Sequence, residues 1–82
     1  MPTPELIALA RRLVADGVLP TTLPTATLGG PSDGAPCAVC SQPIEPGRVE
    51  IELEWGRDGP RLVMHPTCHA AWLLAVRPIV TN

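Results

Sequence analysis

The sequence predicts a small α+β domain in which a β-hairpin lies between two helices. Three patterns support this fold class: helical spacing of apolar residues over 4–16, alternation of apolar and acidic residues over 49–55, and an apolar run that begins behind His65. At 82 residues the chain has the length of one domain. Within that domain we expect an N-terminal helix with a connector over residues 1–36 and a second unit over residues 37–82.

The first predicted element is an amphipathic helix over residues 4–16. Thr3 is a suitable N-cap, Pro4 suits the first helical position, and Gly17 is a typical residue just past a helix end. The apolar residues of this segment share one helical face: Leu6, Leu9, Ala10, Leu13 and Val14. We expect this face to pack against the second half of the chain, with binding of a partner protein as the alternative.

The next segment, residues 18–36, is rich in Pro, Gly, Thr and Ser, which predicts a connector with turns. From its composition we expect the stretch GGPSDG, residues 29–34, to be the most flexible part of this connector. Scattered apolar residues allow the connector to lie along the core in an extended form: Val18, Leu19, Leu23 and Leu28.

Residues 48–65 predict a β-hairpin. Apolar and acidic residues alternate along its first strand: Val49, Ile51, Leu53 and Trp55 against Glu50, Glu52 and Glu54. We expect the apolar set to face the core and the glutamates to face solvent. The turn is GRDGP, and a helix then runs from Pro66 to the closing pair Arg77 and Pro78. This helix is apolar on all sides, so more than one of its faces must be covered.

All cysteine and histidine residues of the chain fall into two groups. Cys37 and Cys40 form a C-x-x-C pair, whereas His65, Cys68 and His69 stand at the head of the second helix. Thiolates and imidazoles are the usual protein ligands of zinc, and a tetrahedral site needs four of them. A hairpin lies between the two groups, and its second strand leads back to where its first strand began. The second group of ligands therefore returns to the first, and the pattern predicts one zinc site.

Five candidates for four positions leave a choice between Cys68 and His69. A thiolate beside zinc competes well for it, so we favour the set Cys37, Cys40, His65 and Cys68, with His69 as the alternative to Cys68. Four protein ligands leave no open coordination position, and the predicted zinc is therefore structural.

The order of C-x-x-C, hairpin and H-x-x-C at a helix start resembles a treble-clef zinc finger, and its ligand order is similar to one half of a LIM domain. The resemblance covers residues 37 to about 76 and implies a knuckle, a hairpin and a helix around one structural zinc. A LIM domain holds two such sites in tandem, whereas this chain has ligands for one. The layout is also similar to small uncharacterised bacterial proteins, a resemblance that implies no activity.

Composition narrows the classes of partner and location. The formal net charge of −2 disfavours general nucleic-acid binding, which depends on neutralising phosphates. The N-terminal residues lack a positive leader followed by an apolar segment, and the longest apolar run, residues 70–76, is too short to span a bilayer. An odd number of cysteines fits a reducing compartment, so we expect a cytoplasmic protein with no membrane contact.

We expect no enzymatic activity. A nucleophilic pair of Cys68 with a histidine has no evident third group to orient it. A metal-dependent nuclease on a treble-clef frame would need histidine and asparagine side chains to hold its catalytic cation, and the only asparagine here is Asn82. A redox role of Cys37 and Cys40 is disfavoured because prolines follow the pair where a redox motif opens a helix. The expected function is a zinc-stabilised protein-interaction or regulatory module with a protein partner or as a homodimer. The alternative is a small nucleic-acid-binding regulator that uses Arg48, Arg57, Arg61 and Arg77, with Arg57 and Arg61 forming a small basic tip at the hairpin turn.

Overall fold

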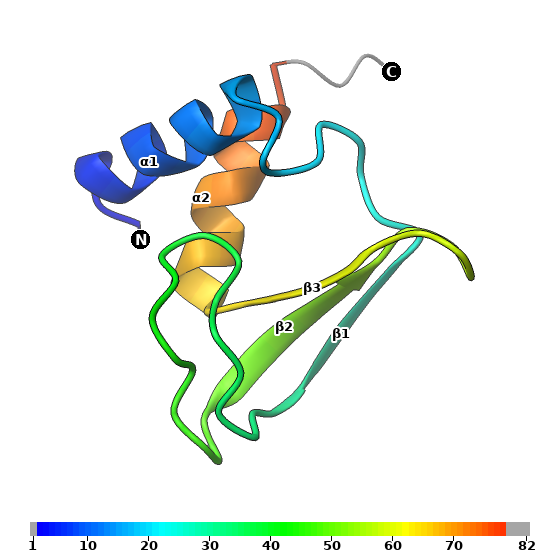
Figure 1. Ribbon diagram of the computed structural model, residues 1–82. Coiled ribbons are helices and arrows are strands. Elements are labelled where there is room, and N and C mark those ends of the chain that lie inside the picture. The colour runs from blue at the N-terminus through cyan, green and yellow to red at the C-terminus, as the bar shows by residue number, and fades with distance from the viewer. Residues whose placement is uncertain (1, 79–82) are drawn as a thin grey trace.

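The computed structural model describes residues 2–78 and shows two helices and a three-stranded antiparallel sheet, which confirms the α+β class. The elements in chain order are α1 (Pro4–Ala15), β1 (Ala26–Pro31), β2 (Val49–Glu54), β3 (Arg61–Met64) and α2 (Pro66–Val76). The sheet order is β1-β2-β3, α1 packs on α2, and α2 contacts β2 and β3 (Figure 1). The last four residues of the predicted second unit, Asn82 included, lie outside the described residues.

Helix α1 begins at the predicted residue and ends one residue before the predicted end, with Asp16 as its C-cap. The Leu6 amide donates a hydrogen bond of 3.2 Å to Oγ1 of Thr3, the N-cap. At the other end Gly17 has a φ of 76°, and the Val18 amide donates to the Leu13 carbonyl at 2.9 Å. This is the hydrogen-bond pattern of a Schellman C-terminus. All residues of the predicted apolar face belong to the core or pack against it: Leu6, Leu9, Ala10, Leu13 and Val14.

The connector after α1 is held to the core by two tryptophans. The indole N–H of Trp72 donates to the Pro20 carbonyl, and that of Trp55 donates to the Thr22 carbonyl, each at 3.0 Å. Leu19 adds a buried side chain to the same stretch. Polar indole groups that lie in or beside a core need such acceptors, so the connector completes the core instead of passing over it.

Strand β1 is the largest difference from the sequence prediction. Gly29 and Gly30, expected at the most flexible point of a connector, pair with Ile51 and Glu50 of β2. Glycine and proline have low β-propensity, so local patterns do not indicate a strand here. The pairing comes from backbone groups and from a neighbouring strand that is distant in the sequence.

The predicted hairpin is present as β2 and β3. Leu53 lies opposite Leu62 and Ile51 opposite Met64, and both Leu53 and Met64 are fully buried. Val49 was expected on the same buried face, but this prediction is wrong, since its side chain is 56% exposed. Val49 lines a surface pocket, together with Pro66 and Thr67 of α2, instead of the core.

Trp72 of α2 is the largest fully buried side chain in the described residues. Its ring meets that of Trp55 edge to face, with centroids 5.9 Å apart and an interplanar angle of 83°. The predicted coverage of α2 on several sides is confirmed, because α1 and the sheet both pack against it. Within residues 2–78, neither helix has the length and apolar character that crossing a membrane requires.

Replacing Leu53 with alanine is expected to lower the free energy of unfolding by about 2–5 kcal/mol, because it leaves a cavity in the centre of the sheet. Leu28→Ala in the neighbouring strand is the matched control, since Leu28 is 50% exposed and its truncation opens no cavity. Urea denaturation followed by tryptophan fluorescence measures both. Equal losses in the two variants would contradict the assignment of the core face.

Candidate metal centre

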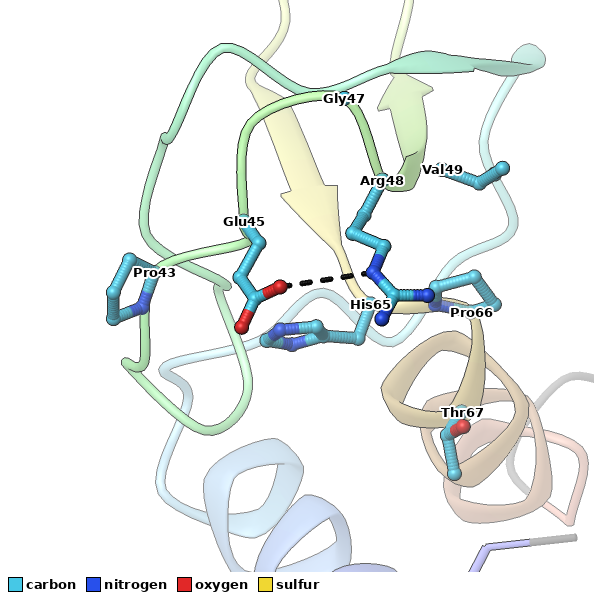
Figure 2. A pocket seen from close by; sticks show the side chains of 8 residues that line it. All are labelled: Pro43, Glu45, Gly47, Arg48, Val49, His65, Pro66 and Thr67. Atoms are coloured by element: carbon cyan, nitrogen blue, oxygen red, sulfur yellow. Dashed lines mark ion pairs between the residues drawn. The ribbon is translucent and has the colours of Figure 1, made fainter.

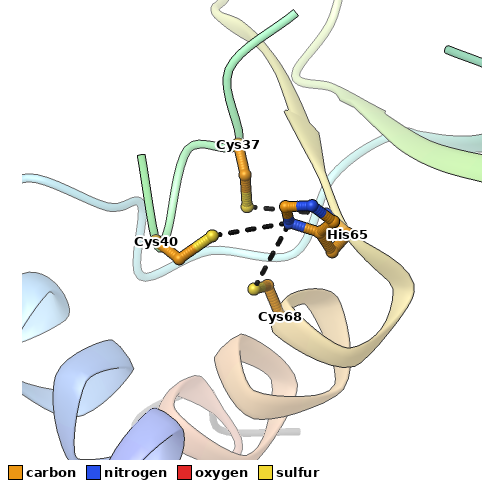
Figure 3. Close-up of side chains that lie close together, drawn as sticks. All are labelled: Cys37, Cys40, His65 and Cys68. Atoms are coloured by element: carbon orange, nitrogen blue, oxygen red, sulfur yellow. Dashed lines mark hydrogen bonds between the residues drawn. The ribbon is translucent and has the colours of Figure 1, made fainter. Parts of the chain in front are cut away.

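Four side chains from distant parts of the chain meet at one point. The sulfur atoms of Cys37, Cys40 and Cys68 and a ring nitrogen of His65 all lie within 4.8 Å of one another. Figure 3 shows the two loop cysteines facing the imidazole, with Cys68 reaching the same point from the start of α2. The structure thus brings together the four residues that the sequence analysis favoured as ligands.

The loop that carries Cys37 and Cys40 is closed by its own backbone. The Cys37 amide donates to the Gln42 carbonyl at 2.9 Å, and the Ser41 amide donates to the Cys37 carbonyl at 3.0 Å. Ser41 has a φ of 66° and is the single non-glycine residue with positive φ in the described part of the chain. This sharp reversal after Cys40 directs both thiols to the same side of the loop.

The end of the hairpin positions the other two side chains. The Ala38 amide donates to the Val63 carbonyl at 2.9 Å, which ties the cysteine loop to β3 two residues before His65. His65 is the N-cap residue of α2, but its side chain makes no capping hydrogen bond. Its ring turns to the thiols instead, with Nδ1 3.4 Å from Sγ of Cys40 and 3.8 Å from Sγ of Cys68.

Backbone amides stabilise the thiolate form of Cys37. The amides of Val39 and His65 donate to its sulfur at 3.4 and 3.5 Å. Burial raises the pKa of Cys37, but hydrogen bonds from the amides of Cys40, His65 and Val39 together lower it by more, from 9.0 to about 7. Sequence reasoning missed these amides because a backbone N–H leaves no mark in the residue pattern.

The third thiol has the opposite tendency. Burial, and then charge repulsion from Cys37, raise the pKa of Cys68 well above its usual range. Three thiolates this close to one another repel strongly in a partly buried site. A divalent cation among them removes this repulsion, because a coordinating thiol is fully deprotonated.

The distances fit a tetrahedral metal ion. Zinc–sulfur bonds of about 2.3 Å and zinc–nitrogen bonds of about 2.0–2.1 Å place tetrahedral ligand atoms about 3.6 Å apart for sulfur and nitrogen, and about 3.8 Å for two sulfurs. The separations of Nδ1 of His65 from Sγ of Cys40 and of Cys68, 3.4 and 3.8 Å, fall on either side of the first value. The four side chains, whose ligand atoms lie within 4.8 Å of one another, can therefore hold one ion once the wider pairs move closer.

His69 does not join this group of side chains. Its ring stacks on that of Trp72, with centroids 6.1 Å apart and an interplanar angle of 27°. Burial lowers the pKa of His69, which favours the neutral ring at this position. The alternative ligand of the sequence analysis thus lies over the core, whereas Cys68 faces the cluster.

A surface pocket of about 690 Å³ lies beside the cluster and includes His65 in its lining. Figure 2 shows an ion pair of Glu45 with Arg48, 3.6 Å long, at the rim of this pocket near the imidazole. Both side chains of the pair are more than three quarters exposed, so the pair adds little to stability. None of the three cysteines lines the pocket, which makes it a neighbour of the cluster and not a route to its thiols.

Comparisons of the chain with protein families, with curated proteins and with solved structures find no match. The functional conclusion therefore rests on the geometry and chemistry of the four side chains themselves.

Metal binding by this cluster is expected to weaken as the pH falls. Cys37 and Cys68 bind as thiolates, so protons compete with the metal for both sulfur atoms. The Cys37 thiolate takes up a proton as the pH drops through about 7, which is its pKa. The pKa of Cys68 is higher, so this thiol carries a proton throughout the range and must release it when the metal binds. Titration with Co²⁺, followed by its thiolate charge-transfer absorption, is expected to show affinity rising more than about tenfold per pH unit between pH 6 and 7. An affinity that does not change with pH would contradict the thiolate ligation.

Proposed function

We propose that the chain is a non-catalytic protein-interaction or regulatory module stabilised by one structural zinc ion. The observation that carries the proposal is the convergence of three thiols and one imidazole within 4.8 Å. A set of soft sulfur ligands with one nitrogen in a tetrahedral arrangement is typical of structural zinc sites. Cys37, Cys40, His65 and Cys68 would hold the ion.

The order of elements supports a treble-clef-like arrangement. Two ligands come from a tight loop, a hairpin of β2 and β3 follows, and the other two ligands stand at the start of α2. This is the arrangement that the resemblance to a treble-clef finger implies. β1 and α1 are additions to it: β1 extends the sheet beside β2, and α1 covers α2.

A structural role for the metal follows from the number of protein ligands. Four ligands fill the tetrahedron and leave no position for a water or a substrate, which a catalytic zinc needs. Binding energy of a structural zinc is folding energy, on the order of 10 kcal/mol in small zinc domains. A chain of this size with a modest core gains its stability largely from such an ion.

An interaction role is favoured over nucleic-acid binding by the charges of the sheet. Arg61, one of the two arginines expected at a basic hairpin tip, makes ion pairs of 3.3 Å with Glu52 and 3.2 Å with Glu54. Its charge is thus balanced within the chain and is not offered to phosphates. Exposed apolar residues, in contrast, lie along the connector and β1: Val18, Leu23 and Leu28. They give a protein partner or a second copy apolar surface to bury. Three reduced thiols in one site also suit the reducing cytoplasm.

The ligand set is tested by two single variants. Cys68→Ser is expected to abolish retention of zinc, because it removes one of four ligands, whereas His69→Ala is expected to retain about one zinc per chain. Elemental analysis of each purified protein, together with the wild type, measures the ratio of zinc to chain. Zinc retention by Cys68→Ser with loss from His69→Ala would reverse the assignment, and a wild type free of zinc would refute the proposal.

Removal of the ion is expected to unfold the protein. A strong chelator should abolish the near-ultraviolet circular dichroism of Trp55 and Trp72, since their packing depends on the position of α2 and the hairpin. Adding zinc in excess should restore the signal. A chelated protein that keeps its tertiary signal would show that the core folds without the metal.

A further inference from the structure

The outer edge of β1 is open. The sheet order places β1 at one end of the sheet, and no segment among residues 2–78 pairs with its outer side (Figure 1). The opposite edge of the sheet is tied to the cysteine loop at one point, where the Ala38 amide donates to the Val63 carbonyl at 2.9 Å. An uncovered edge offers a row of N–H and C=O groups to which an extended segment can add as a further strand.

A slot crosses β1 from this edge toward β2. The register places Leu28 opposite Glu52 and Gly30 opposite Glu50, so these four residues share one face of the sheet. Together with Gly29 they line a hollow of about 100 Å³. A Cβ added at Gly30 would meet no atom within 4 Å, so the space above this residue is free.

Glu50 lies at the end of the slot, and one of its carboxylate oxygens lacks a hydrogen-bond donor. Its Oε1 is buried and accepts no hydrogen bond from the described part of the chain. The other two glutamates of the row, Glu52 and Glu54, share the guanidinium of Arg61. A carboxylate oxygen that is removed from water without a donor carries a free-energy cost, which a cation or an N–H group placed beside it removes.

We propose that an extended segment of a partner protein adds to the free edge of β1 and lays an arginine or lysine side chain through the slot to Glu50. This inference rests on the proposed interaction function and names the surface and the chemistry of the partner. An added strand would lie about 4.8 Å from β1 and about twice as far from β2. Only a long side chain covers that distance, and it can do so only where the strand between carries no side chain, as at Gly30. The apolar stem of the cation packs beside the half-exposed Leu28.

The charges on the glutamate face of the sheet favour a basic protein segment over nucleic acid or a second copy of the chain. Three glutamates and one arginine give it a negative potential, which repels phosphates and therefore disfavours nucleic acid. A second copy that stacked the same face on this one would bring the two rows of glutamates together. A basic, extended protein segment meets both the open backbone and the unpaired carboxylate.

Selection of short random peptides displayed on phage, with the zinc-loaded full chain as the target, tests the proposal. Selected sequences are expected to carry arginine or lysine at one fixed position between β-forming residues. A synthetic copy of the most enriched peptide is then expected to shift the NMR amide signals of Thr27 and Gly29 on the edge of β1. Selected peptides without a basic position, or no enrichment at all, would overturn the proposal.

Three variants locate the contact. Glu50→Gln and Gly30→Val are each expected to weaken binding of that peptide by about tenfold or more, since one removes the charge and the other fills the slot. Glu45→Gln is the matched control, because it removes the charge of an exposed carboxylate that lies outside the slot and outside β1. Equal binding by Glu50→Gln and the wild type, or equal weakening by Glu50→Gln and Glu45→Gln, would refute the assignment.

Two further measurements separate this inference from its foundation. The zinc content of every variant is measured alongside binding, so a zinc-loaded chain that binds no such peptide refutes the docking proposal and leaves the zinc module intact. Sedimentation of the wild type identifies a second copy as the occupant. A dimer that Gly30→Val dissociates would overturn the assignment to a basic partner.

Discussion

Three thiols and an imidazole held within 4.8 Å of one another join parts of the chain that the backbone alone would not hold together. They connect the cysteine loop, the end of the hairpin and the start of α2. Each of these segments is short, and a two-stranded hairpin or a single short helix is marginal in water. Three thiolates this close to one another repel, and a cation among them removes this repulsion. The proposed metal would therefore both stabilise the thiolates and hold these three segments together.

The hydrophobic core and the cluster of thiols share helix α2. Cys68 and Trp72 lie one turn apart on α2, so the first faces the cluster while the second anchors the packing of Trp55, α1 and the connector. A shift of α2 would disturb both the ligand geometry and the burial of Trp72. We infer that the metal site and the hydrophobic core form one cooperative unit, since α2 contributes to both.

The two edges of the sheet differ in their contacts with the rest of the described chain. The edge at β3 accepts a hydrogen bond from the cysteine loop at the Val63 carbonyl, which places that loop beside His65. The edge at β1 has no cover among residues 2–78, and its two glycines leave a passage to Glu50. The first edge lies beside the candidate metal site, and the second is the proposed attachment surface. None of the four candidate ligands lines the slot in that second edge.

The sequence by itself determined the features that follow from local chemistry. Capping residues and apolar spacing defined α1, alternation defined the hairpin, and the spacing of Cys37, Cys40, His65 and Cys68 indicated which side chains would meet. Only the tertiary structure showed that Gly29 and Gly30 belong to a strand, because their pairing is supplied by β2 and not by their own propensity. It also decided the place of His69, whose ring stacks on Trp72, and the exposure of Val49, which lines a surface pocket. Spacing along a chain limits which residues can meet, whereas contacts between distant segments decide which of them do.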